Sequence, residues 1–93
     1  MTWTLVYATS AVRAIKKLDP AVRRRMLAAL RKLRAGPERG KPLQLALKGL
    51  RSWRTGDYRI VYRVIESRIE ILVVAVGHRR DVYERLKKML DAR

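Results

Sequence analysis

Hydrophobic and polar positions alternate with a period of two over residues 50–63, which is typical of β-strands. A Gly-Asp pair at positions 56 and 57 interrupts the alternation, and glycine readily adopts the positive φ that tight turns need. We therefore predict a β-hairpin that turns at Gly56 and Asp57. Parity places the large apolar side chains on the face that we expect helices to cover: Trp53, Ile60 and Tyr62.

The other face of this hairpin is basic. A two-residue turn places Arg54 opposite Arg59, and Arg63 lies further along the same face. Like charges directly opposite each other destabilise a ladder, so a sheet that carries them usually binds an anion between them. Phosphate is the anion that we expect, with this face open to solvent or to a ligand.

Two helices are predicted before the hairpin. Residues 2–8 alternate as a strand, and an amphipathic helix follows from Ser10 as N-cap. A second helix begins with Asp19 as N-cap and Pro20 at the first helical position. Its apolar positions recur on one face: Val22, Met26, Leu30 and Leu33.

The Gly and Pro content of residues 35–42 predicts a loop, and residues 43–49 fit either a helical turn or extended chain. After a reversal near Glu66 and Ser67, residues 69–76 are apolar on both parities, which predicts a central strand that Gly77 ends. Asp81 is the predicted N-cap of a last helix. Its apolar positions are Val82, Leu86, Met89 and Leu90.

This order predicts an α+β domain of the form β-α-α-β-β-β-α over residues 1–93. It consists of an N-terminal strand, a helical hairpin, a three-stranded antiparallel meander and a C-terminal helix. The 93 residues suffice for one hydrophobic core and one domain.

The composition excludes several kinds of site and cofactor. The chain has no cysteine and one histidine, which excludes a disulfide scaffold and leaves no metal-ligand spacing, so we expect no metal and no other cofactor. The first residues lack a basic region followed by a long apolar run, and no segment approaches the length of a membrane span. We therefore expect a cytoplasmic protein with no membrane partner.

The charge balance predicts polyanionic partners. The chain has 23 Lys and Arg against 8 Asp and Glu, a net charge of +15, and the basic residues are spread over its whole length. This excess predicts attraction to nucleic acid with a strong salt dependence. Charge alone also fits a merely solubilising surface, and most basic side chains of the second helix are expected to be solvated.

Two motifs about fifteen residues apart carry a family resemblance. They are Arg-x-Gly-Asp-Tyr-Arg-x-x-Tyr in the hairpin and Gly-His-Arg-x-x-Val-Tyr after the last strand. Together with the helical hairpin they make the chain resemble the RelE branch of the RelE/ParE toxin superfamily. The resemblance covers almost the whole chain. It implies a toxin of a type II toxin-antitoxin system that cleaves messenger RNA in the ribosomal A site without a metal.

Carried over position by position, the resemblance implies a catalytic set: Arg54, Arg59, Arg79 and Tyr83. Arg54 occupies a position that is lysine in the founding member of the family. The founding member's other catalytic lysine has Ser52 or Arg51 in its place. We further expect a nucleic-acid-binding surface around this set, formed by Lys48, Arg51, Arg63 and Arg80.

Metal-free RNA cleavage requires that the 2′-OH lose its proton, that the charge on the phosphorane be neutralised and that the leaving 5′-oxygen gain a proton. Arginine stays protonated, so the arginines are expected to clamp the scissile phosphate. Proton transfer then falls to Tyr83 or to His78. Each of these two side chains could instead be structural, through stacking or hydrogen bonding.

The implied partners are a cognate acidic RelB-like antitoxin, the ribosome with its messenger RNA, and operator DNA only indirectly through the antitoxin complex. An alternative is a ParE-like inhibitor of DNA gyrase, which needs protein contacts and no catalytic constellation. A third interpretation, compatible with either, is a basic partner that forms a DNA-binding repressor with its antitoxin. The Gly-Asp-Tyr-Arg turn and the Val-Tyr pair favour the ribonuclease.

Overall fold

A computed structural model describes residues 2–91 of the chain. Its strands and helices follow one another as β1 (Thr4–Tyr7), α1 (Thr9–Lys16), α2 (Pro20–Ala35), β2 (Lys41–Pro42), β3 (Arg51–Thr55), β4 (Tyr58–Ile65), β5 (Glu70–His78) and α3 (Val82–Asp91). Short 3₁₀ turns cover Pro37–Arg39, Leu45–Leu47 and Glu66–Arg68. The predicted α+β class is confirmed, and the predicted strands and helices occur in the predicted order, with β2 as an additional strand.

The strands form one sheet in the order β1-β5-β4-β3-β2. β1 runs parallel to β5, and the other neighbours are antiparallel. The sheet is one strand larger than the sequence predicts, because β2 lies within the segment expected to be a loop. Proline lacks the backbone N–H that a central strand donates to its neighbours. An edge strand has a neighbour on one side only, so Pro42 is compatible with β2.

The hairpin register agrees with the parity argument. Arg54 pairs with Arg59, Trp53 with Ile60 and Thr55 with Tyr58 across the Gly56-Asp57 turn. Gly56 has φ +61°, the left-handed conformation that the turn requires. β5 extends to His78, two residues beyond the predicted strand of residues 69–76, and includes Gly77.

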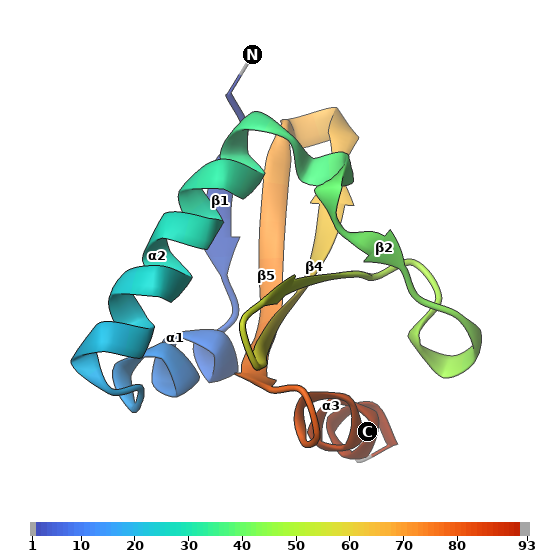
Figure 1. The fold of residues 1–93 in the computed structure, drawn as a ribbon. Coiled ribbons are helices and arrows are strands. Elements are labelled where there is room, and N and C mark those ends of the chain that lie inside the picture. Colours follow the sequence, from blue (N-terminus) through green and yellow to red (C-terminus); the bar gives the residue numbers. More distant parts are fainter. Residues whose placement is uncertain (1, 92–93) are drawn as a thin grey trace.

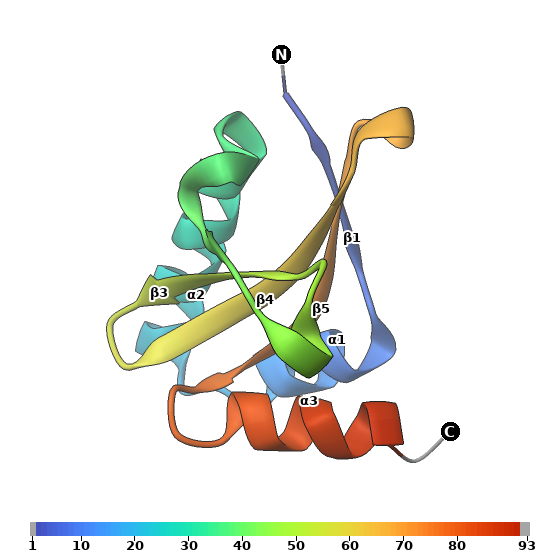
Figure 2. The same ribbon diagram turned by 90° about the vertical axis from the view of Figure 1, so that its right-hand side faces the viewer.

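Helices α1 and α2 cover one face of the sheet (Figures 1 and 2). Their side chains pack against Ile60 and Tyr62, both fully buried, so the predicted helix-covered face is confirmed. From α2 the core receives Met26, Ala29, Leu30 and Leu33. Val22 is only partly buried near the start of that helix.

The opposite face is partly covered, which corrects the expectation that it is open to solvent. Val61, at the centre of that face, packs with Leu47, Leu50, Val82 and Leu86. Helix α3 lies across the end of β5, and the segment 43–50 loops toward it (Figure 2). Arg54, Arg59 and Arg63 therefore lie on the part of this face that the second core cluster leaves uncovered. Met89 on α3 is 49% exposed, and the side chain of Leu90 lies outside the described part.

The N-cap of α1 differs from the prediction, whereas the N-cap of α2 agrees with it. Ala8, not Ser10, is the N-cap of α1, and the Ser10 hydroxyl donates instead to the Val74 carbonyl at 3.2 Å. That bond ties α1 to β5 beyond the end of β1. Asp19 and Pro20 take the predicted positions at the start of α2, although no side-chain cap bond forms. No helix within residues 2–91 is long and apolar enough to cross a membrane.

Candidate functional site

A basic cleft of about 330 Å³ lies on the partly covered face of the sheet. It is lined by Arg39, Lys41, Ser52, Trp53, Arg54 and Arg59. Arg54 is exposed, and its Nε donates to the Gly56 carbonyl at 3.0 Å. Arg59 is partly buried, and its Nε is buried with no hydrogen-bond partner among the described residues. A buried guanidinium N–H without a partner is well suited to donate to an anion that enters the cleft.

Tyr83, in the first turn of α3, contacts two residues that line this cleft. The guanidinium carbon of Arg59 lies 5.8 Å from the centroid of the Tyr83 ring, within the range of a cation–π contact. The Tyr83 hydroxyl lies 2.7 Å from the hydroxyl of Ser52, which is 5% exposed. Three chain segments that are distant in sequence therefore meet at one point: β3, β4 and the start of α3.

Arg79 and Arg80 lie in the turn between β5 and α3, and both are exposed. The backbone N–H of Arg79 donates to the Asp57 carbonyl at 2.9 Å, which ties this turn to the tip of the β3–β4 hairpin. The contact holds the Arg79 backbone next to the Gly56-Asp57 turn. The Arg80 backbone N–H donates to Nδ1 of His78 at 3.3 Å.

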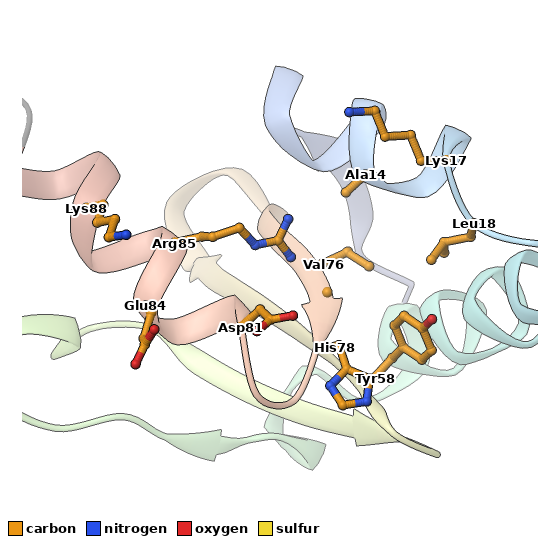
Figure 3. Close-up of a pocket in the computed structure, with 11 residues that line it drawn as sticks. Ala14, Lys17, Leu18, Tyr58, Val76, His78, Asp81, Glu84, Arg85 and Lys88 are labelled. Atoms are coloured by element: carbon orange, nitrogen blue, oxygen red, sulfur yellow. The ribbon is translucent and has the colours of Figure 1, made fainter.

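His78 lies on the other face of the sheet. It pairs with Tyr58, whereas Arg59 pairs with Gly77, so His78 and Arg59 point to opposite sides. The His78 ring contacts Tyr58 edge to face, with centroids 5.8 Å apart. Figure 3 shows both rings in a pocket of about 490 Å³ between α1 and α3, which Arg85 and Asp81 also line. The structure does not bring His78 to the basic cleft.

The four predicted nucleic-acid-binding residues are dispersed. Arg51 pairs with Tyr62, and its Nη1 donates to the Gly40 carbonyl at 2.6 Å, so its guanidinium supports the loop before β2. Lys48 and Arg63 are exposed beside the second core cluster. Only Arg80, in the turn after β5, adjoins the predicted catalytic arginine at position 79.

Arg39 and Lys41 also line the cleft, and neither is among the site residues predicted from the sequence. Lys41 enters through β2, where it pairs with Ser52. A two-residue strand carries no periodic pattern, so nothing in the sequence around it indicated that this segment joins the sheet. The segment contributes two further cations to the cleft. No carboxylate is among the described residues that line it.

Buried Tyr62 fixes the chain just before β2. Its hydroxyl accepts from the Gly40 N–H at 2.9 Å and donates to the Pro37 carbonyl. Gly40 approaches so closely that a Cβ there would lie 2.5 Å from the Tyr62 hydroxyl oxygen. Burial raises the pKa of Tyr62, and the Gly40 N–H and Arg51 oppose this to a smaller extent.

Comparison with known proteins supplies the family. A model described as the ParE toxin of the type II toxin-antitoxin system parDE matches residues 5–83. Toxin RelG of Mycobacterium tuberculosis is 37% identical, over 91% of this chain and 100% of the relative. Toxin RelE of the same organism is 39% identical over 47% of this chain and 45% of that protein.

Solved structures agree with the sequence relatives. The toxin-antitoxin complex RelBE2 from M. tuberculosis contains a chain with a TM-score of 0.79 and 32% identity, covering 85% of this chain and 100% of that one. The isolated RelE toxin of E. coli has a TM-score of 0.71 over 95% of this chain and 98% of that chain; at 24% identity it supports the fold alone.

Proposed function

Because this chain belongs to the RelE branch of the RelE/ParE toxin superfamily and is a type II toxin, we propose that it is a ribosome-dependent endoribonuclease. It cleaves messenger RNA in the A site without a metal and so inhibits translation in the cytoplasm. The observation that carries this proposal is the Arg54–Arg59 pair, whose members lie opposite each other in a cleft with no carboxylate among its described lining residues.

The arginines act on charge and not on protons. Arg54 and Arg59 clamp the scissile phosphate, and the unpartnered Nε of Arg59 donates to it. As the 2′-oxygen attacks phosphorus, the negative charge that develops on the phosphorane is stabilised by these fixed donors. Arg79 closes the clamp from the turn after β5, and Tyr83 packs against Arg59 beside the cleft.

A cognate antitoxin is the expected regulator, since solved relatives include complexes with RelB antitoxins from M. tuberculosis, E. coli and Pyrococcus horikoshii. We propose an acidic RelB-like partner for this chain. It neutralises the toxin by covering the basic cleft or by displacing α3, which carries Tyr83. Operator DNA is contacted only through that complex.

Production of the chain without its antitoxin tests the proposal. We expect growth arrest in which incorporation of labelled amino acids stops before incorporation of labelled thymidine. Messages recovered from the arrested cells should carry new 5′ ends at A-site codons. An Arg54→Gln/Arg59→Gln double variant, produced at the same level, is the matched control and should not arrest growth.

A gyrase inhibitor is the second candidate, because the matching family model is that of a ParE toxin. It predicts the opposite order in the same experiment, with DNA synthesis failing first and protein synthesis continuing. That order would contradict the ribonuclease proposal, and purified chain would then inhibit DNA supercoiling by gyrase in vitro.

A further inference from the structure

The proposed reaction needs a proton donor, and the predicted donors are poorly placed for it. When the bond from phosphorus to the 5′-oxygen breaks, that oxygen leaves as an alkoxide unless it gains a proton. Arginine cannot give one up in a protein. His78 lies on the other face of the sheet, and the Tyr83 hydroxyl is engaged with buried Ser52 at 2.7 Å.

Lys41 is the one lysine among the described residues that line the cleft. It pairs with Ser52, which in turn pairs with Val61, so Lys41 lies on the face of the sheet that carries Arg54 and Arg59. Its side chain is exposed and therefore reachable by substrate and solvent. Lys41 therefore brings an ammonium group from the adjacent strand to the cleft that Ser52, Arg54 and Arg59 also line.

The backbone at Lys41 is held firmly. The preceding residue, Gly40, is bound on both sides, since its N–H donates to the Tyr62 hydroxyl and its carbonyl accepts from Arg51. Gly40 and Pro37 are buried, although the segment is irregular. An edge strand anchored in this way presents its side chain from a fixed point, which a catalytic group requires.

We infer that Lys41 is the general acid of the cleavage reaction, an inference that rests on the proposed function. The 2′-oxygen forms a bond to phosphorus, and its proton passes to solvent water. The bond from phosphorus to the 5′-oxygen breaks with its electron pair on that oxygen, which takes a proton from the Lys41 ammonium group. The products are a 2′,3′-cyclic phosphate and a 5′-hydroxyl, and solvent reprotonates the lysine.

Two substitutions separate proton donation from charge. Lys41→Arg keeps the positive charge but cannot donate the proton, whereas Lys41→Gln loses both. We expect each variant to cleave messenger RNA on programmed ribosomes about 100-fold or more slowly in single turnover, the usual size of a general-acid contribution. Lys32→Gln, an exposed change on α2, is the matched control and should cleave at the wild-type rate.

A modified message provides the decisive comparison. Replacing the scissile 5′-oxygen with sulfur gives a thiolate leaving group that needs no proton. Lys41→Arg should cleave this substrate within about threefold of the wild-type rate, because the step it impairs is bypassed. Lys41→Gln should lose less on this substrate than on ordinary RNA, since only the missing charge still slows it. Thermal melts that match the wild type confirm that the variants are folded.

The outcomes are distinguishable. If Lys41→Arg cleaves ordinary RNA at the wild-type rate, Lys41 contributes charge only and the inference is overturned. Equal losses on the oxygen and sulfur substrates overturn it as well, since they indicate a phosphate contact. If the wild-type chain cleaves neither substrate on the ribosome, the ribonuclease proposal itself fails, and with it the role of Lys41.

Discussion

The Arg59 guanidinium and the Tyr83 ring, with 5.8 Å between guanidinium carbon and ring centroid, connect the central hairpin to the C-terminal helix. Arg59 is fixed by the sheet, and Tyr83 depends on α3 being packed against the second core cluster through Val82 and Leu86. The contact between Arg59 and Tyr83 therefore forms only when α3 is in place. Displacing that helix would take the tyrosine ring away from Arg59 and leave both arginines on the sheet.

Arg59→Met should strongly reduce the cleavage rate with no loss of stability. We expect cleavage to fall about 100-fold or more, the usual effect of removing one donor to a developing oxyanion. The midpoint of thermal unfolding should stay the same or rise. An unpartnered buried polar group destabilises a fold by about 1–3 kcal/mol, whereas a partly buried cation–π contact contributes about 0.5–2 kcal/mol.

Single-turnover cleavage and differential scanning calorimetry measure the two effects of Arg59→Met. The control is Arg68→Met, an exposed change in the turn between β4 and β5, far from the cleft along both strands. It should alter neither quantity. A folded Arg59→Met protein that cleaves at the wild-type rate would remove Arg59 from the site.

Ser52 and Tyr83 should behave as one unit in a double-mutant cycle. Tyr83→Phe keeps the ring under Arg59 but leaves the buried Ser52 hydroxyl without its partner, which should destabilise the fold by about 1–3 kcal/mol. Ser52→Ala in the Tyr83→Phe background removes the orphaned hydroxyl and should restore part of that loss. Urea unfolding of all four proteins measures the coupling.

Additive losses in that cycle would show that the two hydroxyls do not interact. The cleavage rate of Tyr83→Phe answers a separate question. Since we assign proton donation to Lys41, the ring of Tyr83 should suffice, and the rate should fall by less than about tenfold.

Much of the fold was predictable because the hairpin is a local structure. Its turn residues and its alternation lie within one short segment, so the pairing of Arg54 with Arg59 follows from parity. The face on which His78 lies could not be predicted in this way. Residues 69–76 are apolar on both parities, so the pattern contains no information on which side of β5 faces α1 and α2.

The contacts that complete the site are long-range. Ser52 and Tyr83 are 31 residues apart, and only the packing of α3 brings their hydroxyls together. Lys41 reaches the cleft because Tyr62, 22 residues after Gly40, fixes the preceding backbone. Neither relationship leaves a periodic trace in the sequence. The pattern and the motifs therefore point to Arg54 and Arg59 but not to Lys41, which lines the same cleft.

The stability of the protein should fall in alkaline solution, in part through Tyr62. Burial raises the folded-state pKa of Tyr62 above its ordinary value of 10.0, so the unfolded chain releases this proton first as the pH rises. The contribution of Tyr62 to the free energy of unfolding is fully present below its ordinary pKa and is lost as the pH rises through its folded-state pKa. Tyr62→Phe removes this part of the pH dependence.

At neutral pH, Tyr62→Phe should itself destabilise the fold by about 1–3 kcal/mol, because the Gly40 N–H and the Pro37 carbonyl lose their partner. Urea unfolding at intervals from about pH 8 to about pH 12 measures both effects. We expect the free energy of unfolding to fall less steeply above about pH 10 for Tyr62→Phe than for the wild type. Parallel curves would contradict the assignment.

Salt should weaken the complex between this chain and its cognate antitoxin. The chain has a net charge of +15, and the cleft is lined by cations without a carboxylate among its described residues, so an acidic partner gains electrostatic attraction that salt screens. Titration calorimetry from about 0.05 M to about 0.5 M salt should show a steadily rising Kd, mainly through slower association.

The double variant Arg54→Gln/Arg59→Gln distinguishes two routes of neutralisation. It should flatten the salt dependence of Kd if the antitoxin covers the cleft, and should leave that dependence unchanged if the antitoxin acts by displacing α3. An affinity of the wild-type complex that does not vary with salt would exclude electrostatic neutralisation by either route.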